Sequence, residues 1–403
     1  MLYVFDGKLP HGRIDFITCW FYLVAQYMEG RPQIKTAFVT TNSICQGVQV
    51  VFWNWVFKHN IEISFAYKSF KWKNNAKDNA GVTVTVIGME NSNPKPKYLY
   101  DDCSVKTVTH ISPYLIEGSN LIVEPNNIVP LGLPMEYGTK FSDGGNLILT
   151  QNEKEALIKE FPDSGKFIKR LIGSEEFING KERFCIWIDE NEVKEALMIQ
   201  PLKNRIDATR DFRLKSKADS TVDFAEKSWK ARQISFKPNA TAIIIPIVSS
   251  ERRYYIPIGF LEKDTVISAS SFAIYDAPLW LFAILTSRMH MTWMRAVAGR
   301  LKTDYRYSST LVYNTFPFPK LTKAQKKALE STATSIIDTR EEHYDMTMAQ
   351  LYDPDKMPDD LKAAHEANDL LVDRLFRKTG FDSDEDRLAE LFRLYEANTK
   401  GDN

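Results

Sequence analysis

The sequence predicts an α/β protein of about two or three domains that ends in a helical segment. Its 403 residues exceed one ordinary domain. Residues 13–89 alternate between helical and strand patterns, while residues 321–403 show helical apolar spacing. Hydrophobic residues make up 44% of the chain and charged residues 26%, which is typical of a globular protein with well-filled cores.

The first ninety residues predict an α/β sheet with one antiparallel strand. The expected elements, in order, are a helix at 13–29, a strand at 35–41, a helix at 47–58, a strand at 61–67, a polar loop at 70–80 and a strand at 81–88. The last strand alternates strictly between apolar and polar residues. Because the final two strands follow each other like a hairpin, the second should run against an otherwise parallel sheet.

The middle of the chain predicts a connector and then a mixed α/β and α+β region. Residues 92–165 are rich in Pro, Gly and Asn, which favour turns. Within residues 166–319 the patterns predict strands at 183–188, 241–248 and 253–260, a short helix at 191–200 and a long helix at 277–299. Pro246 and Pro257 place their strands at sheet edges or bulges. The Met and Trp residues of the long helix are expected in a core.

Charge is distributed unevenly along a chain whose net charge is zero. Residues 321–403, with expected helices at 322–341 and 359–377, carry 12 basic and 19 acidic residues, a charge of −7, and the remainder carries +7. Residues 201–240 hold ten basic and five acidic residues. A basic body is compatible with DNA contact, although solvated surface charge accounts for it equally well.

The N-terminus shows no signal-peptide pattern, and no apolar run has the length of a membrane span, so we expect a cytoplasmic protein without a membrane partner. The four cysteines, at 19, 45, 103 and 185, form no closely spaced pair, so we expect no zinc site and small buried apolar roles.

Polar residues gather where the 35–41 strand ends. Thr40, Thr41, Asn42 and Ser43 offer hydrogen-bond donors and acceptors at the carboxyl end of a strand, where open α/β sheets bind ligands. A polar turn that caps the next helix fits the same residues.

Aromatic and basic residues alternate in the segment that follows the 61–67 strand. Phe70 and Trp72 suit stacking on a base that an enzyme has turned out of a duplex, and Lys71 and Lys73 suit contact with phosphates. Two ordinary core aromatics would fit the pattern as well.

Two further segments combine arginine with tyrosine. Glu251, Arg252 and Arg253 stand before two tyrosines, and arginine and glutamate are side chains that read base edges. Arg306 and Tyr307 stand in a Tyr-Arg-Tyr-Ser run whose side chains suit phosphates. A surface turn with a salt bridge is the competing interpretation of the first segment.

The sequence lacks the GxGxxG, GxxxxGK[ST] and HExxH motifs, and its six histidines do not cluster, so nothing indicates a metal-dependent hydrolase.

In their order, these segments resemble the MmeI-like branch of restriction–modification methyltransferases. Distinctive runs include Phe-Val-Thr-Thr-Asn-Ser, Phe-Lys-Trp and Asn-Thr-Phe-Pro-Phe-Pro. The matching blocks are 15–20, 37–47, 65–72 with 80–88, 111–115, 138–145, 171–180, 183–187, 248–257, 305–308 with 313–319, and 351–358 with 364–366. So many blocks in one order make the resemblance specific.

The resemblance implies a Rossmann-like lobe that transfers a methyl group from S-adenosylmethionine to adenine N6 in double-stranded DNA, fused to a target-recognition domain. It implies part of that lobe at 1–112, a connector at 113–165, a mixed α/β target-recognition domain at 166–320 and a helical domain at 321–403. Asn42, Phe70 and Trp72 would line the target-base pocket. The DNA-contacting side chains would be Lys71, Lys73, Glu251, Arg252, Arg253, Arg306 and Tyr307.

The sequence departs from the family pattern near its start. The glycine-rich motif for S-adenosylmethionine and the catalytic Asn-Pro-Pro-Phe/Tyr motif belong upstream of Asp15, and residues 1–12 do not match them. Those residues position the adenine amino group, and positioning supplies much of such catalysis. We therefore expect a C-terminal portion of the methyltransferase that is inactive alone and needs the missing N-terminal half in cis or in trans.

Two other classes of function stay open. A stand-alone DNA-binding specificity subunit of a multi-subunit methyltransferase would share the DNA contacts, but it would not need the elements at 13–90. A non-DNA interaction domain would fit the neutral charge and the acidic C-terminal segment.

Overall fold

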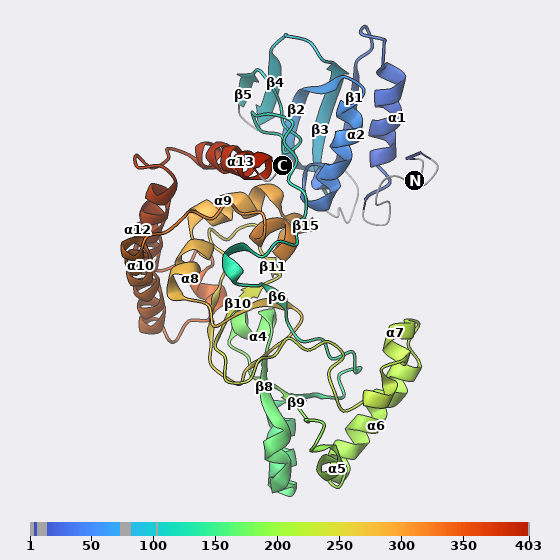
Figure 1. Cartoon of the computed structure of the whole chain (residues 1–403), viewed down its shortest axis with the longest axis vertical. Coiled ribbons are helices and arrows are strands. Elements are labelled where there is room, and N and C mark those ends of the chain that lie inside the picture. Colours follow the sequence, from blue (N-terminus) through green and yellow to red (C-terminus); the bar gives the residue numbers. More distant parts are fainter. Residues whose placement is uncertain (1–3, 6–13, 73–81, 102–103, 402–403) are drawn as a thin grey trace. The chain divides into compact units, whose positions relative to one another are not determined.

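The computed structural model describes residues 4–5, 14–72, 82–101 and 104–401. Figure 1 labels its helices and strands, which divide into two compact units. The first unit contains Met1–Ile128, Arg288–Lys320 and Asp373–Asn403, and the second contains Val129–Ser287 and Leu321–Val372. The mixture of sheets and helical segments confirms the predicted α/β and α+β fold class.

The first unit is built on a five-stranded sheet in the order β1-β3-β2-β4-β5. The strands are β1 (Thr36–Thr41), β2 (Ile61–Trp72), β3 (Val82–Asn91), β4 (Lys97–Asp101) and β5 (Ser104–Val108). β3 runs antiparallel to both β1 and β2, while β2 and β4 are parallel. The expected antiparallel strand is confirmed as β3, and β5, which pairs antiparallel with β4, adds a second one.

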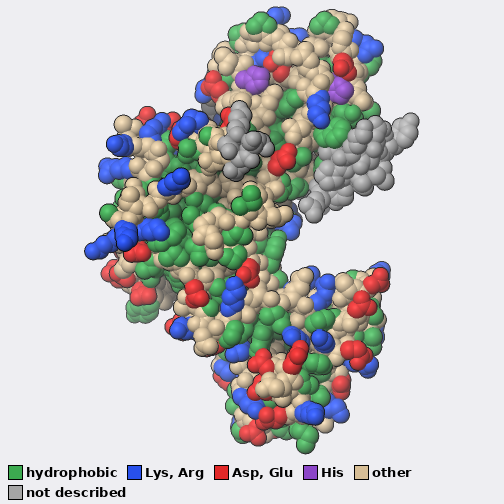
Figure 2. Space-filling model, in the orientation of Figure 1, with side chains coloured by type: hydrophobic (Ala, Val, Ile, Leu, Met, Phe, Trp, Pro, Cys, Tyr) green, Lys and Arg blue, Asp and Glu red, His purple; other side chains and the backbone are tan. Residues whose placement is uncertain are grey.

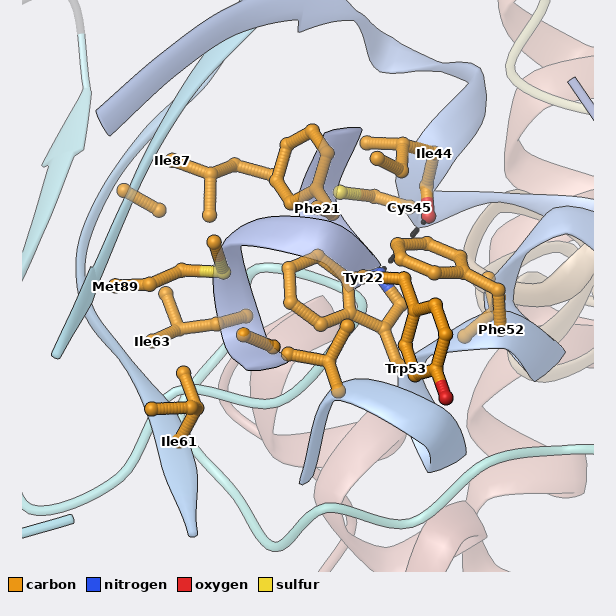
Figure 3. Close-up of a cluster of buried hydrophobic side chains, with 14 of the residues drawn as sticks. Phe21, Tyr22, Ile44, Cys45, Phe52, Trp53, Ile61, Ile63, Ile87 and Met89 are labelled. Atoms are coloured by element: carbon orange, nitrogen blue, oxygen red, sulfur yellow. Dashed lines mark hydrogen bonds between the residues drawn. The ribbon is translucent and has the colours of Figure 1, made fainter. Parts of the chain in front are cut away.

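Two helices pack on one face of this sheet, α1 (Thr18–Met28) and α2 (Trp53–Phe57). Figure 3 shows their aromatic side chains meeting Ile63, Ile87 and Met89 from the strands. The expected helix at 47–58 is instead a 3-10 helix, η3 (Gly47–Phe52), followed by the short α2. β-Branched residues at 48, 50 and 51 and a left-handed Gly47 disfavour a regular α-helix there.

The first unit also contains α9 (Arg288–Val297), β15 (Gly299–Leu301), β16 (Asp304–Arg306), the π-helix η7 (Ser309–Tyr313) and α13 (Asp384–Gly401). α9 packs on α13, with the Trp293 ring 5.5 Å from that of Phe392. The single long helix expected at 277–299 is wrong, because α8 (Leu279–Leu285) ends before α9 begins. Ser287 Oγ donates to the Ile284 carbonyl at the break, a local bond that competes with helix continuation.

One sheet of the second unit has the order β12-β10-β14-β6. Its strands are β12 (Gly259–Leu261), β10 (Ala242–Pro246), β14 (Ser271–Tyr275) and β6 (Glu136–Tyr137). The strand with Pro246 was expected at an edge or a bulge, and β10 as a whole lies between two neighbours. β12 pairs only as far as Ile244, so Pro246 faces a partner on one side only. Residues 253–258 form no strand, and the expected strand there is reduced to β12.

The other sheet of the second unit has the order β13-β8-β9-β7. Its strands are β13 (Val266–Ile267), β8 (Ile168–Ile172), β9 (Arg183–Ile186) and β7 (Ile148–Thr150), and β9 confirms the strand expected at 183–188. Short helices flank it, namely α3 (Gln151–Glu160), η5 (Pro162–Phe167), α4 (Ser174–Asn179), α5 (Val193–Ala196), α6 (Gln200–Leu214) and α7 (Asp219–Val222). α6 was not predicted, because its charged face carries few apolar residues.

The C-terminal helices of the second unit match the sequence prediction closely. α10 (Lys323–Glu342) begins after Thr322, whose hydroxyl accepts from the Gln325 amide in a capping box. α11 (Met348–Leu351) and α12 (Asp359–Phe376) follow. The remaining short elements of the chain are η2 (Asn42–Cys45), η4 (Pro130–Gly132), η6 (Ala225–Lys227) and β11 (Val248–Ser249). Within the described ranges, no helix has the length and apolar character that crossing a bilayer requires.

A buried arginine holds the base of α6 in the second unit. Arg213 is fully buried, and its guanidinium donates to the carbonyls of Phe141, Ser142, Phe224, Lys227 and Lys230 at 2.7 to 3.1 Å. Burial lowers its pKa because desolvation disfavours the charged form. One side chain therefore links the backbone carbonyls of residues 141–142, 224, 227 and 230 through hydrogen bonds.

We expect Arg213→Met to lower the free energy of unfolding by at least ~3 kcal/mol, since it removes the buried guanidinium and all five of its hydrogen bonds to backbone carbonyls. Urea unfolding followed by circular dichroism measures this loss. Arg210→Met on the same helix is the matched control. Arg210 is exposed and forms a surface ion pair with Glu226, so its replacement should cost under ~1 kcal/mol. Equal losses in the two variants would contradict the proposed role of Arg213.

A buried histidine–tyrosine pair lies in the first unit. His290 Nε2 lies 2.7 Å from the Tyr307 hydroxyl, and both side chains are buried. Burial lowers the pKa of His290 to about 3. Below about pH 6.5 the unfolded chain binds a proton at this position that the folded chain does not, so folding loses stability as pH falls toward 3.

We expect His290→Gln, which keeps a polar group for Tyr307 but cannot titrate, to lessen this acid sensitivity. The wild-type melting temperature should fall more steeply than that of the variant between about pH 7 and about pH 4. Thermal unfolding across that range measures both slopes. Among the described histidines, His365 is also buried, but it is present in both proteins and cancels in the comparison. Parallel slopes would rule out this role for His290.

Candidate functional site

The carboxyl ends of β1 and β2 lie along the same edge of the five-stranded sheet, the edge that the strand ends form. Thr41 of β1 and Phe70 of β2 both lie opposite Val84 of β3, one on each side. Since neighbouring strands are spaced about 4.8 Å apart, the two strand ends are separated by roughly 10 Å. Asn42, which directly follows Thr41, is thereby brought to the same edge as the aromatic residues of β2.

The aromatic residues of this edge extend the strand rather than lying in a loop. β2 continues to Trp72, so the loop predicted from residue 70 is wrong for residues 70–72. The Phe70 and Trp72 rings lie 6.4 Å apart. Trp72 is 43% exposed, so an ordinary core role does not describe it. Lys71 is exposed beside it, and Lys73 lies outside the described residues.

Two tyrosines that the sequence analysis did not select join this aromatic row. Tyr67 stacks on Tyr100 of β4 with ring centres 5.3 Å apart, and Phe70 meets Tyr67 edge-on at 5.8 Å. Tyr98 and Tyr100 alternate with Leu99, which is a strand signal. The neighbouring Pro and Asn residues led to a connector prediction instead.

Two hydrogen bonds hold the turn after β1, one within the turn and one from Trp53. The hydroxyls of Thr41 and Ser43 lie 2.8 Å apart, and Trp53 Nε1 donates to the Ile44 carbonyl at 3.1 Å, the dashed contact in Figure 3. Asn42 is half-buried at the start of η2. These two hydrogen bonds therefore restrict the backbone that carries the Asn42 side-chain amide.

A cavity of about 350 Å³ lies within the first unit next to this edge. Arg295 and Ala296, from the end of α9, help to form its wall. The Oε1 atom of Gln46 is buried without a protein hydrogen-bond partner. The full lining is Cys45, Gln46, Lys68, Ser69, Asp101, Tyr114, Leu115, Ile116, Arg295 and Ala296. The end of α9 thus lies across a cavity from residues close to the two strand ends.

The Glu251–Arg253 segment lies on a turn of the second unit. Arg252 is exposed and forms an ion pair with the exposed Asp355. Such a surface pair contributes little stability, so Arg252 can exchange its partner at low cost. Behind the turn, the buried Tyr255 donates its hydroxyl to Asp369 Oδ2 at 2.6 Å. The face in Figure 2 shows acidic and basic side chains intermixed on this unit.

Arg306 and Tyr307, although adjacent, have different environments. Arg306 is exposed on β16, opposite Gly299. Tyr307 is buried and bonded to His290, so its hydroxyl is not available to a phosphate, and the expected DNA contact does not fit the structure. Alternation along a strand turns neighbouring side chains to opposite faces, and the sequence alone did not indicate which face is buried.

Cys19, Cys45 and Cys185 are buried, as expected for small apolar residues, and burial raises the pKa of the Cys185 thiol to about 12. Over the part of the chain that the structure describes, no group of three or more His, Cys, Asp or Glu side chains is arranged to hold a metal ion.

Comparison with known proteins assigns these segments to one family. Residues 1–101 match the family model for the MmeI DNA-methyltransferase domain, residues 117–320 match the MmeI target recognition domain, and residues 321–401 match the MmeI C-terminal domain. The chain is 44% identical over 404 residues to DNA methyltransferase A of Bacillus subtilis (strain 168), a match that covers 99% of this chain and 46% of that protein.

A solved structure is similar throughout. The Type IIL restriction-modification enzyme MmeI, determined in complex with DNA, matches with a TM-score of 0.92 and 36% identity. That match covers 99% of this chain and 54% of the MmeI chain, so the present chain spans about half the length of these relatives. With methyltransferase, target-recognition and C-terminal segments in the same order, this chain belongs to the MmeI family of DNA methyltransferases.

Proposed function

We propose that this chain holds the target base and reads the recognition sequence in a site-specific DNA adenine-N6 methyltransferase that uses S-adenosylmethionine. The observation that carries the proposal is the register that brings Asn42 to the same sheet edge as Phe70 and Trp72. We assign residues 1–112 to the methyltransferase lobe, 113–165 to a connector, 166–320 to target recognition and 321–403 to the helical domain.

The chemistry of the edge suits a planar base. An enzyme that modifies a base inside a duplex must flip it out and hold it by stacking and by hydrogen bonds to its edge. Trp72 and Phe70 offer aromatic faces, and the Asn42 amide offers both a donor and an acceptor, which adenine can match. Lys71 and Lys73 adjoin Trp72 in the sequence, and they would meet the phosphates that flank the flipped nucleotide.

The methyl donor, S-adenosylmethionine, requires residues beyond these. The described part of the edge presents threonine, asparagine, aromatic and lysine side chains, which do not form the glycine-rich turn that holds such a cofactor. We propose that the remaining part of the methyltransferase domain supplies this turn, in cis or in trans. β1 is compatible with such an addition, because it stands at the edge of its sheet and a further strand could pair with it.

The second unit would make most of the contacts that recognise the DNA base sequence. We propose Arg252 and Arg253 as readers of guanine edges and Glu251 as an acceptor from cytosine. Arg306, from the first unit, would contact phosphate or base. The charge of +7 outside the C-terminal segment favours duplex DNA as the partner. We propose that the protein acts in the cytoplasm.

The function is tested by measuring tritiated methyl transfer to duplex DNA. We expect no transfer from this chain alone and transfer to adenine N6 when the N-terminal methyltransferase half is joined or added. In that complete enzyme, Trp72→Ala should slow methylation at least about tenfold with a smaller effect on DNA affinity, because base stacking is worth ~1–3 kcal/mol.

Tyr98→Ala is the matched control for Trp72→Ala. Tyr98 is 42% exposed on β4 of the same sheet, so its loss removes similar aromatic surface away from the strand ends. Equal loss of methylation and binding in Trp72→Ala would contradict the stacking role. Transfer by the chain alone would contradict the need for an N-terminal half, and DNA binding with no transfer even when that half is present would favour a specificity subunit.

We expect Arg253→Ala to relax specificity at one position of the recognition site. The loss of a bidentate contact should reduce discrimination at that base pair by ~1–3 kcal/mol while binding to unrelated DNA changes little. Competition binding with single-base variants of the site measures it. Arg170→Ala removes an exposed ion pair with Glu182 in the same unit and should leave discrimination unchanged. A uniform weakening on all duplexes would instead indicate a phosphate contact.

A further inference from the structure

The hairpin formed by β15 and β16 has one packed face and one exposed face. Arg300 lies over the Tyr305 ring at 3.7 Å and donates to the Thr303 carbonyl at 2.7 Å, and Tyr305 is buried. Leu301 and Arg306 alternate with these residues and point to the other side. Leu301 is 51% exposed, beside the two-residue turn of Lys302 and Thr303.

The root of this hairpin touches the segment that follows β1. A Cβ atom built on Gly47 would lie 2.9 Å from Gly299 Cα, so the two backbones are in direct contact. Gly47 has a φ of +57°, and it comes five residues after Asn42. The helix that leads into the hairpin, α9, ends at the cavity that Ser69 of β2 also lines. The hairpin therefore starts beside the sheet edge that carries Asn42 and Phe70, within the same compact unit.

The composition of the hairpin suits duplex DNA. Residues 299–306 contain three basic residues and one acidic residue, a charge of +2. The exposed Leu301 side chain lies near the tip of this positively charged hairpin, and the hydrophobic effect disfavours its contact with water. Proteins that distort DNA insert such apolar side chains between bases, where the side chain replaces lost stacking contacts. A base that has been flipped out leaves a gap of this kind.

We propose that the β15–β16 hairpin enters the duplex at the target base pair and that Leu301 fills the space vacated by the flipped adenine. Lys302 and Arg306 flank Leu301 and contact the phosphates on either side. The inference rests on the proposed function, because it requires a base held at the edge formed by β1 and β2. It adds a residue that lowers the cost of flipping without touching the flipped base.

The test uses the complete enzyme, with the N-terminal methyltransferase half present, and duplexes that carry 2-aminopurine at the target adenine. Fluorescence of 2-aminopurine rises when the base leaves the stack. Leu301→Ala should reduce this rise and slow methylation about tenfold, while site-specific binding changes less than about threefold. Leu370→Ala is the matched control, because Leu370 is a 58% exposed leucine on α12. It should behave as wild type.

A second duplex separates gap filling from a general structural effect. With an abasic site opposite the target adenine there is no base pair to break, so flipping costs less and Leu301→Ala should recover most of the wild-type rate. An unchanged defect on the abasic duplex would overturn the proposal, as would wild-type flipping by Leu301→Ala on the intact duplex. If the wild-type enzyme itself neither bound nor methylated DNA, the proposed function would fail instead.

Discussion

The pairing of β3 between β1 and β2 is the constraint on which the candidate site depends. One residue, Val84, faces Thr41 on one side and Phe70 on the other, so the pairing at Val84, which β2 reaches after a register shift between Tyr67 and Phe70, sets the separation of the two strand ends. A slip of one residue would turn every side chain of a strand to the opposite face of the sheet. Ile87 and Met89 prevent such a slip, because they are buried against α1 and α2 and only one register keeps them there.

The second unit fixes its exposed turn by a different means, a buried polar network. Arg340 donates to the Tyr352 hydroxyl and to the Ile258 carbonyl, and Tyr352 lies 2.7 Å from His365 Nε2. His365 stacks on Tyr255, whose hydroxyl bonds Asp369. The last residues of the turn that carries Arg252 and Arg253 are thus tied to α10, α11 and α12. Since a partly satisfied buried network is costly, this arrangement favours one conformation of the turn.

Local patterns predicted the elements whose stability is local. Strict alternation identified β3, and helical apolar spacing identified α10. The prediction of one helix across 277–299 was wrong, because its apolar residues serve helices in two different compact units and the spacing carries no record of that division. Burial was equally hidden for Tyr307, since partners seventeen residues away decide its environment. Asn42, Phe70 and Trp72 could be selected as residue types, but their convergence depends on a register that no single segment encodes.

The exposed edge of β1 has a practical consequence for preparing the protein. Among the described residues, β1 has a strand partner on one side only, so its other side is a template on which another strand can add, and native proteins usually cover or shorten such edges. Expressed by itself, the chain would offer this template to a second copy, which favours self-association over a monodisperse sample. A strand that pairs with β1 would cover this template and remove the competition.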